Sequence, residues 1–451
     1  MMDRYDKKRP ELVADVLKKI KEQNIKYIWL QFTDLVGTLK SFGVASNRMP
    51  EILESGASFD GSSISGFGRT EESDQVAVPD PTTFAEIPWR TTEHNVARFI
   101  CDVYTPDDKR YDGDPRYILQ KASKKIADAG YTFKCAPEME FFWLKPGGEG
   151  APTESDFRGY FDADPADENQ LMRREVATYA ENFGIEIETM HHEVAKSQHE
   201  IDIKYGPACE LADNAVTLKS LVKIVGKRHG YVGTFMPKPF FGHNGSGMHV
   251  HQSLWKGNTN CFYDENDVNK ISQTMRSFIA GELKYAKEFC AITNSWPNSF
   301  KRLVPGYEAP TFIAWGFKNR SMLIRVPNFL KNPSKAARCE IRCPDPAGNV
   351  YLQIAALMTA GFEGVKNKLE ATAPVELNIF HADKCEQDRL GIENLPRDLG
   401  DALDHFEKSK LMKELMGETA FNAYLALKRE EFRLYSAQIS DWELKRYTPF
   451  L

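Results

Sequence analysis

Several features that mark whole protein classes are missing from this sequence. No apolar run approaches the roughly 18 residues needed to cross a bilayer, and residues 1–10 are charged and lack the apolar core of a signal peptide. The eight cysteines are scattered and include no C-x-x-C pair, which argues against a zinc ribbon and a thioredoxin-type dithiol. We therefore expect a cytoplasmic protein with free thiols and no membrane partner.

Strongly basic segments and phosphate-binding loops are missing as well. The net charge is −6 and no basic block stands out, so we expect no nucleic-acid partner, because phosphate backbones require clustered Lys and Arg. No G-x-x-x-x-G-K-[S/T] run occurs, which argues against a P-loop nucleotide site. What remains is the composition of an ordinary globular protein.

The length of 451 residues is long for one domain, because single hydrophobic cores rarely grow beyond roughly 250–300 residues. Segment 105–115 is rich in turn-forming and charged residues and predicts a boundary between domains 1–107 and 108–451. Hydrophobic spacing and turn residues predict helices at 11–23, 116–129 and within 401–444, strands at 25–32, 38–44, 96–104 and 131–144, and an exposed loop at 56–68. Long segments separate the strands, so we predict an α+β fold with an antiparallel or mixed sheet.

Polar residues alternate with apolar ones in several short stretches, so that they share one face of each predicted strand. The shared faces carry Glu138 with Glu140, His249 with His251 and Ser253, and Arg338 with Glu340 and Arg342, and stretch 200–204 repeats the alternation. For any one stretch taken alone, the solvent-facing side of an antiparallel sheet is the favoured interpretation. Together they predict a cluster, because carboxylates on one face repel each other unless cations neutralise them.

Such a cluster favours divalent cations. Carboxylates with a single imidazole select Mg²⁺ or Mn²⁺, and the absence of cysteine from the set disfavours structural zinc. Arg302, Arg320 and Arg325 lie in further stretches of this kind, and guanidinium groups hold carboxylate and phosphate. The residues predict a two-metal site that handles phosphate, but they do not name the substrate.

Motifs along nearly the whole chain resemble, in order, those of class I glutamine synthetases. They occupy residues 59–74, 137–140, 191–200, 238–253, 304–308, 319–320 and 338–342. The resemblance implies a small β-grasp domain and a larger catalytic domain built on a curved antiparallel sheet flanked by helices. It also implies a dodecamer of two stacked hexameric rings, in which a loop of each β-grasp domain reaches the neighbouring subunit's site.

The resemblance further implies an enzyme of nitrogen assimilation that uses ATP and two or more Mg²⁺ or Mn²⁺ ions to ligate ammonia to glutamate through γ-glutamyl phosphate. Asp60, Glu308 and Arg320 are then implied to act in catalysis, with Asp60 taking a proton from ammonium. The implied metal ligands are Glu140, Glu193 and Glu200 for one ion and Glu138, His249 and Glu340 for the other. The implied substrate-binding residues are Ser63, Asn244, Gly245, Arg302, Arg325 and Arg342, and the implied ATP-binding residues are Tyr205, His251, Ser253, Lys335 and Arg338.

One departure from the family bears on regulation. The adenylylated branch carries a target tyrosine in the stretch equivalent to about 390–396, where this chain has none. The chain is therefore similar to the branch that is controlled by feedback and by regulatory protein partners. Arg69 matches an arginine linked to glutamine feedback in that branch, although a solvated loop arginine is the simpler interpretation.

Three other interpretations of the site stay open. A γ-glutamyl ligase that uses a polyamine or another amine shares the metal and phosphate machinery, but the residues matching the ammonium pocket favour ammonia. A silent structural homologue is expected to have lost metal ligands, which this chain retains. A two-metal phosphohydrolase explains the cluster but leaves the 59–74 loop without a purpose. His191, His192 and His199 are interpreted as structural.

Overall fold

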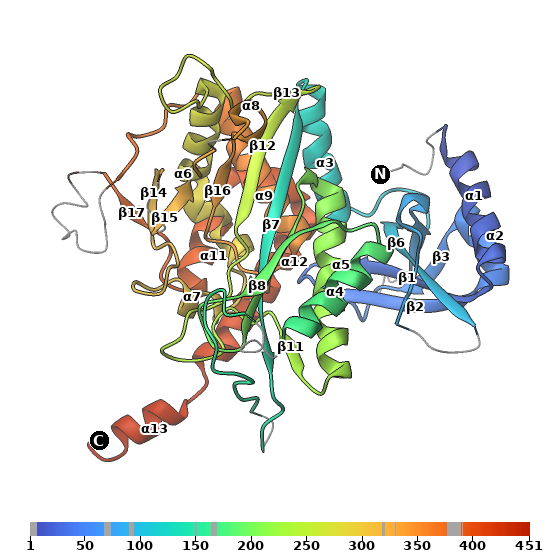
Figure 1. The fold of residues 1–451 in the computed structure, drawn as a ribbon, viewed down its shortest axis with the longest axis horizontal. Helices are drawn as coiled ribbons and strands as arrows, with labels where there is room; N and C mark the ends of the chain where they lie inside the picture. Colours follow the sequence, from blue (N-terminus) through green and yellow to red (C-terminus); the bar gives the residue numbers. More distant parts are fainter. Residues whose placement is uncertain are drawn as a thin grey trace.

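The computed structural model describes residues 7–66, 74–89, 94–148, 151–163, 169–317, 321–329, 331–376, 389 and 391–451. A smaller part at the N-terminus packs beside a larger part that contains the rest of the chain (Figure 1). Among the described residues, none of the helices combines the length and the apolar character that a membrane crossing requires.

The smaller part is a sheet with helices packed against it. Its elements are α1 (Arg9–Glu22), β1 (Ile25–Thr33), β2 (Leu39–Ala45), α2 (Met49–Ser55), β3 (Ala57–Asp60), β4 (Asp74–Pro79), β5 (Ala85–Glu86) and β6 (Asn95–Tyr104). The strand order is β2-β1-β6-β4-β3, with β5 paired to β6, and β1 runs parallel to β6 while the other pairs are antiparallel. Val16 and Ile20 of α1 lie in one buried cluster with Ile28 and Leu30 of β1, so the predicted apolar helix face forms the core of this part.

The prediction of an exposed loop over 56–68 was wrong for its first residues. Ala57–Asp60 forms β3, and Ala57 and Phe59 pack against the buried cluster. The ring of Phe59 stacks on that of Phe32 with centroids 4.6 Å apart. The many Gly and Ser residues of the stretch hid a short alternating strand within it.

The larger part is built on an eleven-stranded sheet and a set of helices. Its strands are β7 (Thr132–Leu144), β8 (Ile187–His192), β9 (Gln198–Ile203), β10 (Gly206–Pro207), β11 (Val232–Thr234), β12 (Val250–Lys256), β13 (Thr259–Asn260), β14 (Phe312–Gly316), β15 (Met322–Arg325), β16 (Cys339–Ile341) and β17 (Glu393–Asn394). Its helices are α3 (Pro115–Asp128), α4 (Gln170–Asn182), α5 (Ala208–Arg228), α6 (Gln273–Thr293), α7 (Ser299–Arg302), α8 (Pro333–Ala336), α9 (Val350–Lys366), α11 (Leu399–Lys408), α12 (Lys410–Ser436) and α13 (Asp441–Tyr447).

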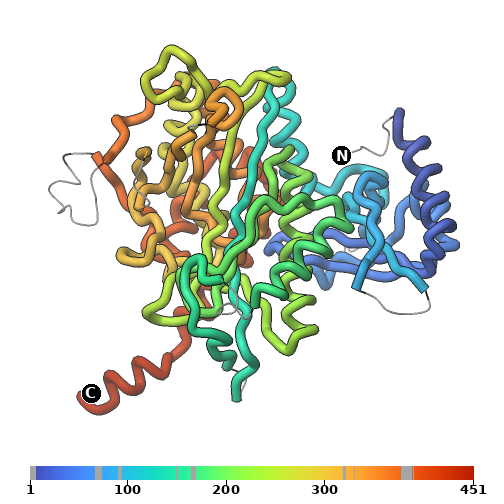
Figure 2. Tube along the Cα trace, in the orientation of Figure 1, coloured from blue at the N-terminus to red at the C-terminus, as the bar shows by residue number. Residues whose placement is uncertain are grey.

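The strands follow the order β17-β14-β15-β16-β12-β7-β9-β8, and the pairings are antiparallel except for the parallel pair β14–β15. β7 and β12 run side by side through the middle of this part (Figure 2). The predicted antiparallel sheet is thus observed with one parallel exception. Helices α6 and α9 approach closely behind the sheet because glycines face each other: a Cβ on Gly364 would lie 2.0 Å from the carbonyl oxygen of Ser277.

Buried polar contacts join the two parts. The guanidinium of Arg116 in α3 donates to Asp80 (2.9 Å) and Asp102 (2.6 Å) of the smaller part and to Asp213 (2.8 Å) of α5. Leu35, from the turn after β1, is fully buried in the core of the larger part. Strand β6 ends at Tyr104 and α3 begins at Pro115, and the predicted boundary at 107/108 between these elements stays a prediction.

Candidate active site

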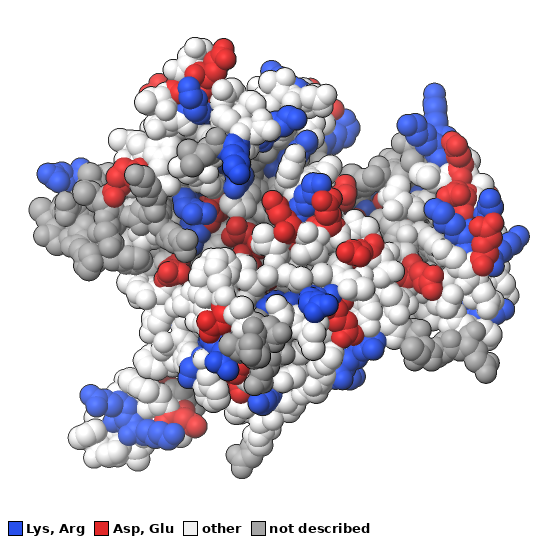
Figure 3. All heavy atoms as spheres, viewed as in Figure 1, with Lys and Arg blue, Asp and Glu red and all other residues white. Residues whose placement is uncertain are grey.

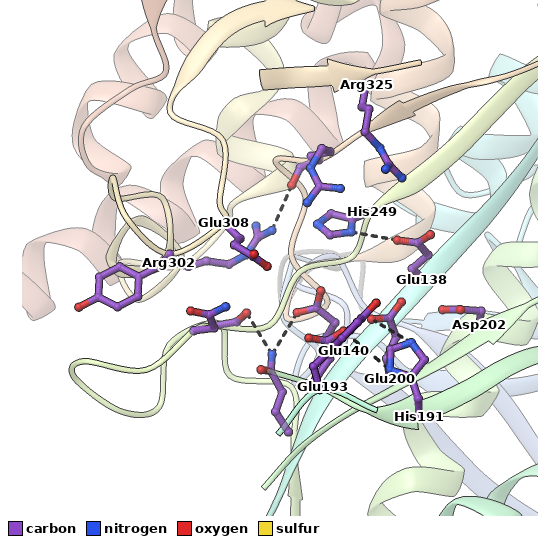
Figure 4. Close-up of a pocket in the computed structure, with 16 residues that line it drawn as sticks. Glu138, Glu140, His191, Glu193, Glu200, Asp202, His249, Arg302, Glu308 and Arg325 are labelled. Carbon is purple, nitrogen blue, oxygen red and sulfur yellow. Dashed lines mark hydrogen bonds and ion pairs between the residues drawn. The ribbon is translucent and has the colours of Figure 1, made fainter. Parts of the chain in front are cut away.

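Neighbouring strands of the large sheet present polar side chains on one face, where they line a cavity (Figure 4). The register pairs Glu138 with Asp202, Glu140 with Glu200, and His251 with Glu340. Met139 and Ile341, which alternate with these residues, are fully buried in the core behind the sheet. The period-two pattern of the sequence therefore gathers charged side chains from strands that are far apart along the chain.

One set of ligand-type residues, Glu138, His249 and Glu340, is here called the balanced group because basic side chains contact each carboxylate. Glu138 accepts from His249 Nδ1 (2.9 Å) and His251 Nε2 (2.7 Å). Burial would raise the pKa of Glu138, but the hydrogen bonds from these two histidines hold it well below its usual range. The balanced group therefore keeps its Glu138 carboxylate ionised.

Glu340 is the most enclosed carboxylate of the balanced group. Arg325 Nε donates to Glu340 Oε2 at 2.5 Å, and Arg342 donates to Oε1. Burial would raise the pKa of Glu340, but the positive charge of Arg342 outweighs it, and the pKa falls to about 2. Burial and the neighbouring Arg342 also lower the pKa of His249 to about 4, so its imidazole is neutral and can act as a metal ligand.

A second set, Glu140, Glu193 and Glu200, is here called the acidic group. The basic side chain beside it, His191, lies no closer than 3.8 Å to Glu193 and 3.9 Å to Glu200. Glu140 accepts from Gly247 N (2.7 Å) and Gln198 Nε2 (3.1 Å), which are neutral donors. Burial and the negative charge of Glu193 raise the pKa of Glu140 to about 8. Burial, Asp202 and Glu140 raise the pKa of Glu200 well above its ordinary value. The acidic group is thus short of positive charge.

Both groups have the donor chemistry of divalent-cation sites. The ligand atoms of Glu138, His249 and Glu340 lie within 4.8 Å of one another, and His191, Glu200 and Asp202 form a similar cluster beside the acidic group. Oxygen donors with few imidazoles fit Mg²⁺ or Mn²⁺. Buried carboxylates with raised pKa values are the environment that a bound cation would relieve.

Arginines and a loop carboxylate complete the wall of the cavity opposite the acids. Arg302 is buried, and its guanidinium is held by the carbonyl oxygens of Arg342 (3.1 Å) and Cys343 (2.9 Å). Glu308 lies on the loop after α7, points toward the same space, and has a φ of 56°. A non-glycine residue in this left-handed region is uncommon and is often found at functional sites.

A second cavity adjoins the first and shares Glu138 and Asp202 with it. Its lining contains every residue for which the resemblance implied ATP contact: Tyr205, His251, Ser253, Lys335 and Arg338. Lys134 and Trp255 also line it, with the Lys134 ammonium 4.2 Å from the centre of the Trp255 ring. The side chain of Arg338 reaches the first cavity's ligands through His251, to which its Nε lies at 3.3 Å.

The structure does not bring every predicted site residue to this place. Asp60 and Ser63 lie at the end of β3 and in the following turn, exposed on the smaller part, and line neither cavity. Hydrogen bonds from the Ser62 side chain and backbone lower the pKa of Asp60. Arg69 and Arg320 fall outside the described residues. The other predicted ligands and binding residues line one cavity or the other or, in the case of Glu340, contact its walls.

Several cavity residues were missed. His191 was interpreted as structural, yet it lines the first cavity with its Nε2 3.9 Å from Glu200 Oε2. Asp202 lies on the same face of β9 as Glu200, and burial and the charge of Glu138 raise its pKa to about 6. The alternation of 200–204 carried the signal for Asp202. Gln198 begins β9 and shares its face with Glu200 and Asp202, so the same alternation extends to it. Tyr160 gave no signal, because its position depends on a loop.

The sheet and the paired cavities fit a metal-dependent enzyme that handles anionic substrates, and comparison with known proteins narrows this class. Residues 112–447 match the catalytic domain of glutamine synthetase, and residues 24–106 match its β-grasp domain. The glutamine synthetase of Methanosarcina mazei is 47% identical over 439 residues, 97% of this chain and 98% of the relative. That of Thermotoga maritima is 46% identical over 96% of this chain and 99% of its own.

Solved structures of similar fold point to the same family as the sequence comparisons. The structure of Plasmodium falciparum glutamine synthetase superposes with a TM-score of 0.86 at 27% identity, covering 97% of this chain and 98% of that chain. A GmaS–ADP complex gives a TM-score of 0.87 at 28% identity, covering 96% and 99%. This chain belongs to the glutamine synthetase family, and its predicted fold of a β-grasp domain followed by a larger α+β domain is confirmed.

Proposed function

We propose that this chain is a glutamate–ammonia ligase, which phosphorylates the side-chain carboxylate of glutamate with ATP and lets ammonia displace the phosphate to give glutamine. The observation that carries the proposal is the pair of adjoining cavities that share Glu138 and Asp202. One is lined by carboxylates and arginines, and the other contains an aromatic and basic lining suited to a nucleotide. A nucleotide phosphate that extends from the second cavity into the first would pass the balanced group, because both cavities are lined by Glu138.

The proposed metal ions, Mg²⁺ or Mn²⁺ and two or more per site, would be held by the balanced group and the acidic group. When bound, such ions neutralise phosphate and carboxylate charge, which lowers the barrier to phosphoryl transfer. The residues of this chain contribute the ligand geometry: β7, β9, β12 and β16 are rigid strands, and Arg325 and Arg342 fix the carboxylate of Glu340.

Glutamate is proposed to bind between the acidic group and Arg302. Arg302 and Arg342 carry buried positive charge on this wall, and Asn244 and Gly245 line the same cavity. A guanidinium pairs well with a carboxylate, so these residues would orient the amino acid with its side chain toward the shared edge. Arg325 and Arg320 are proposed to stabilise the transferred phosphoryl group.

Glu308 is proposed to close over the acyl phosphate and to accept a proton after ammonia attacks. Its backbone is held at a φ of 56°, and Tyr307 beside it packs on Lys238, whose Nζ lies 3.6 Å from the ring centre. A loop fixed in this way can exclude water from an intermediate that hydrolysis would waste.

Ammonium activation is proposed to need a second copy of the chain. Asp60 and Ser63 are exposed and remote from this chain's own cavities, so they could serve only a neighbour's site. The helix α13 projects from the body and carries acidic and basic side chains on its surface (Figures 1 and 3). Its Trp442 is 63% exposed. Both observations support a homo-oligomer, proposed as a dodecamer. Light scattering of the purified protein measures this directly.

The proposed regulation of this chain rests on segment 390–396 and on Arg69. The resemblance of 390–396 to the branch without a target tyrosine supports control by feedback and by protein partners. Arg69 is proposed to take part in inhibition by glutamine. An Arg69→Ala variant that glutamine still inhibits fully would end this assignment. Cytoplasmic location stays a prediction.

The deciding experiment measures phosphate release from ATP with glutamate and Mg²⁺, with and without ammonium, and identifies the product by chromatography. Glutamine formed only with ammonium supports the proposal, and an Asp60→Ala variant should then lose ammonium-dependent turnover. Release that ignores ammonium but responds to another amine would replace it with a γ-glutamyl ligase. The curated relatives do not favour that alternative, since they are named glutamine synthetase.

A further inference from the structure

Behind the acidic group lies a buried polar cluster that the proposed reaction does not use. His191 faces the cavity, whereas the next residue, His192, is fully buried. Its Nε2 lies 3.2 Å from Asp156 Oδ1, in the segment before α4. Asp156 also accepts from Ser197 N (2.7 Å) and Asn169 Nδ2 (2.9 Å). Four elements or loops therefore meet at one carboxylate.

Both ring nitrogens of His192 lie next to acceptors. Nδ1 lies 2.7 Å from the carbonyl oxygen of Glu193, and Nε2 lies 3.2 Å from Asp156 Oδ1. The imidazole therefore bridges the residue after β8 and the Asp156 carboxylate, and loss of either side chain would leave a buried polar group without this partner.

The neighbouring His199 excludes a metal ion as the reason for this cluster. Arg173 donates to His199 Nδ1 at 2.9 Å, and the Asn169 amide lies 3.4 Å from Nε2. The lone pair that a metal would need is occupied by a donor, and a guanidinium beside it repels a cation. The cluster is a hydrogen-bonded network, and its contacts fix the position of a neighbouring turn.

This turn comprises residues 193–198, and the network contacts it on the side away from the cavity, where Ser197 N donates to Asp156. Within the turn, Glu193 N donates to Gln198 O (2.8 Å), Gln198 N donates to Ala195 O (3.1 Å), and Ser197 has a φ of 64°. The Ser197 hydroxyl accepts from Ser155 N at 2.6 Å. The turn presents Glu193 to the cavity at one end. At the other end Gln198 donates to Glu140 Oε2 at 3.1 Å.

We propose that Asp156 and His192 are positioning residues for the metal site, because together they fix the turn that sets Glu193 directly and Glu140 through Gln198. The proposal rests on the proposed metal role of the acidic group. It places a buried histidine–carboxylate contact behind that group, where outer contacts of this kind typically change metal affinity 10–100-fold when removed.

The test compares Mn²⁺ binding, measured by electron paramagnetic resonance without substrates, in the wild type, Asp156→Asn and a matched control, Asp102→Asn. Asp102 is also a buried carboxylate, but it contacts Arg116 and lines neither cavity. Asp156→Asn should raise the apparent dissociation constant for Mn²⁺ about 10–100-fold. Asp102→Asn should change this constant less than about threefold. The turnover rate of Asp156→Asn should fall. Its KM for ATP should stay within about twofold of the wild-type value, because no residue of the turn lines the nucleotide cavity.

Unchanged Mn²⁺ binding in Asp156→Asn, or equal weakening in both variants, would overturn the proposal. If Asp156→Asn does not fold, His192→Gln takes its place, since glutamine keeps a polar side chain but lacks the ring that bridges Glu193 O and Asp156, and the same two outcomes decide. The result is independent of the ligase assignment. A wild type that binds Mn²⁺ but makes no glutamine refutes that assignment, while the variant comparison still decides the positioning role.

Discussion

The two halves of the proposed metal site both bury carboxylates, but they differ in the positive charge that contacts those carboxylates. In the balanced group, histidines and arginines contact each carboxylate, and the pKa of Glu340 falls to about 2. In the acidic group, Glu140 accepts from neutral donors, His191 lies at 3.8 Å from Glu193 and 3.9 Å from Glu200, and the pKa of Glu140 rises to about 8. One half is complete as folded, and the other lacks positive charge.

This difference indicates how the site is assembled. The balanced group is held by the fold itself, since removing one partner leaves a buried charge unpaired. The acidic group costs the fold stability, because three carboxylates share a buried space without a cation. We infer that the fold pre-forms the half next to the nucleotide and leaves the half next to glutamate to be completed by the ion. The same Glu→Gln change should therefore have opposite effects on stability in the two halves.

The largest effect is expected for Glu340→Gln in the balanced group. The change leaves Arg325 and Arg342 facing a neutral amide inside the protein. Breaking a buried ion pair in this way costs about 3–5 kcal/mol of unfolding free energy. The thermal midpoint of the metal-free protein, measured at equal protein concentration, should fall accordingly.

The control for Glu340→Gln is Asp404→Asn, which breaks an exposed pair with Arg429 at 2.6 Å. Exposed pairs contribute at most about 1 kcal/mol, so this variant should unfold almost like the wild type. Equal destabilisation by the two changes would show that the balanced group is not held by its ion pairs.

Metal addition is expected to give the next largest effect. Saturating Mg²⁺ or Mn²⁺ should raise the thermal midpoint of the wild type, with about 2.7 kcal/mol of stabilisation at a hundredfold excess over the dissociation constant. A chelator should reverse the shift. In Glu140→Gln the shift should shrink, because the acidic group loses a ligand. A full shift in that variant would assign the ion to other residues.

Glu140→Gln should also stabilise the metal-free protein, by roughly 1–3 kcal/mol at pH 7.5, because it removes a buried carboxylate with raised pKa. The amide oxygen can accept from Gly247 and Gln198, and the amide nitrogen can donate toward Glu193. Glu308→Gln, exposed on the rim of the same cavity, is the matched control and should change stability by less than about 0.5 kcal/mol. A destabilised Glu140→Gln would contradict the contrast between the two groups.

Local patterns predicted the direction of the side chains in the balanced group, while their grouping as one set of ligands came from the family resemblance. Glu138 and Glu340 lie on β7 and β16, where alternation fixes the face of each side chain, and His249 comes directly before β12. The elements themselves were predicted to within a few residues, as for β1 and α3. These features depend on neighbours a few residues away.

Other features depend on contacts that no local pattern encodes. His191 and His192 are adjacent in sequence, yet one lines the cavity and the other is buried against Asp156, because β8 has the cavity on one side and a network on the other. The short strand β3 was hidden by its Gly and Ser neighbours, and the parallel pairing of β14 with β15 follows from the path of the chain. Asp60 lines neither cavity of this chain.

A buried carboxylate outside the site, Glu282, tests the effect of burial on pKa separately from the acidic group. Glu282 in α6 has no exposure, accepts from Gln252 Nε2 at 2.7 Å, and has a pKa raised by burial to about 8. Between pH 4.5 and 8 the unfolded chain ionises this group while the folded chain keeps it protonated. The folded state then binds more protons, so stability falls as pH rises, by at most about 1.4 kcal/mol per pH unit from this group.

Glu282→Gln should remove that contribution. Gln252 Oε1 is buried beside it without a hydrogen-bond partner, so the new amide nitrogen has an acceptor within the pair. The thermal midpoint of the variant should therefore exceed that of the wild type by a margin that grows from pH 5 to pH 8. Because Glu282 touches neither cavity, Mn²⁺ binding should be unchanged. A margin that is constant with pH would mean that Glu282 is ionised in the fold, and burial alone could then not account for the raised pKa of Glu140.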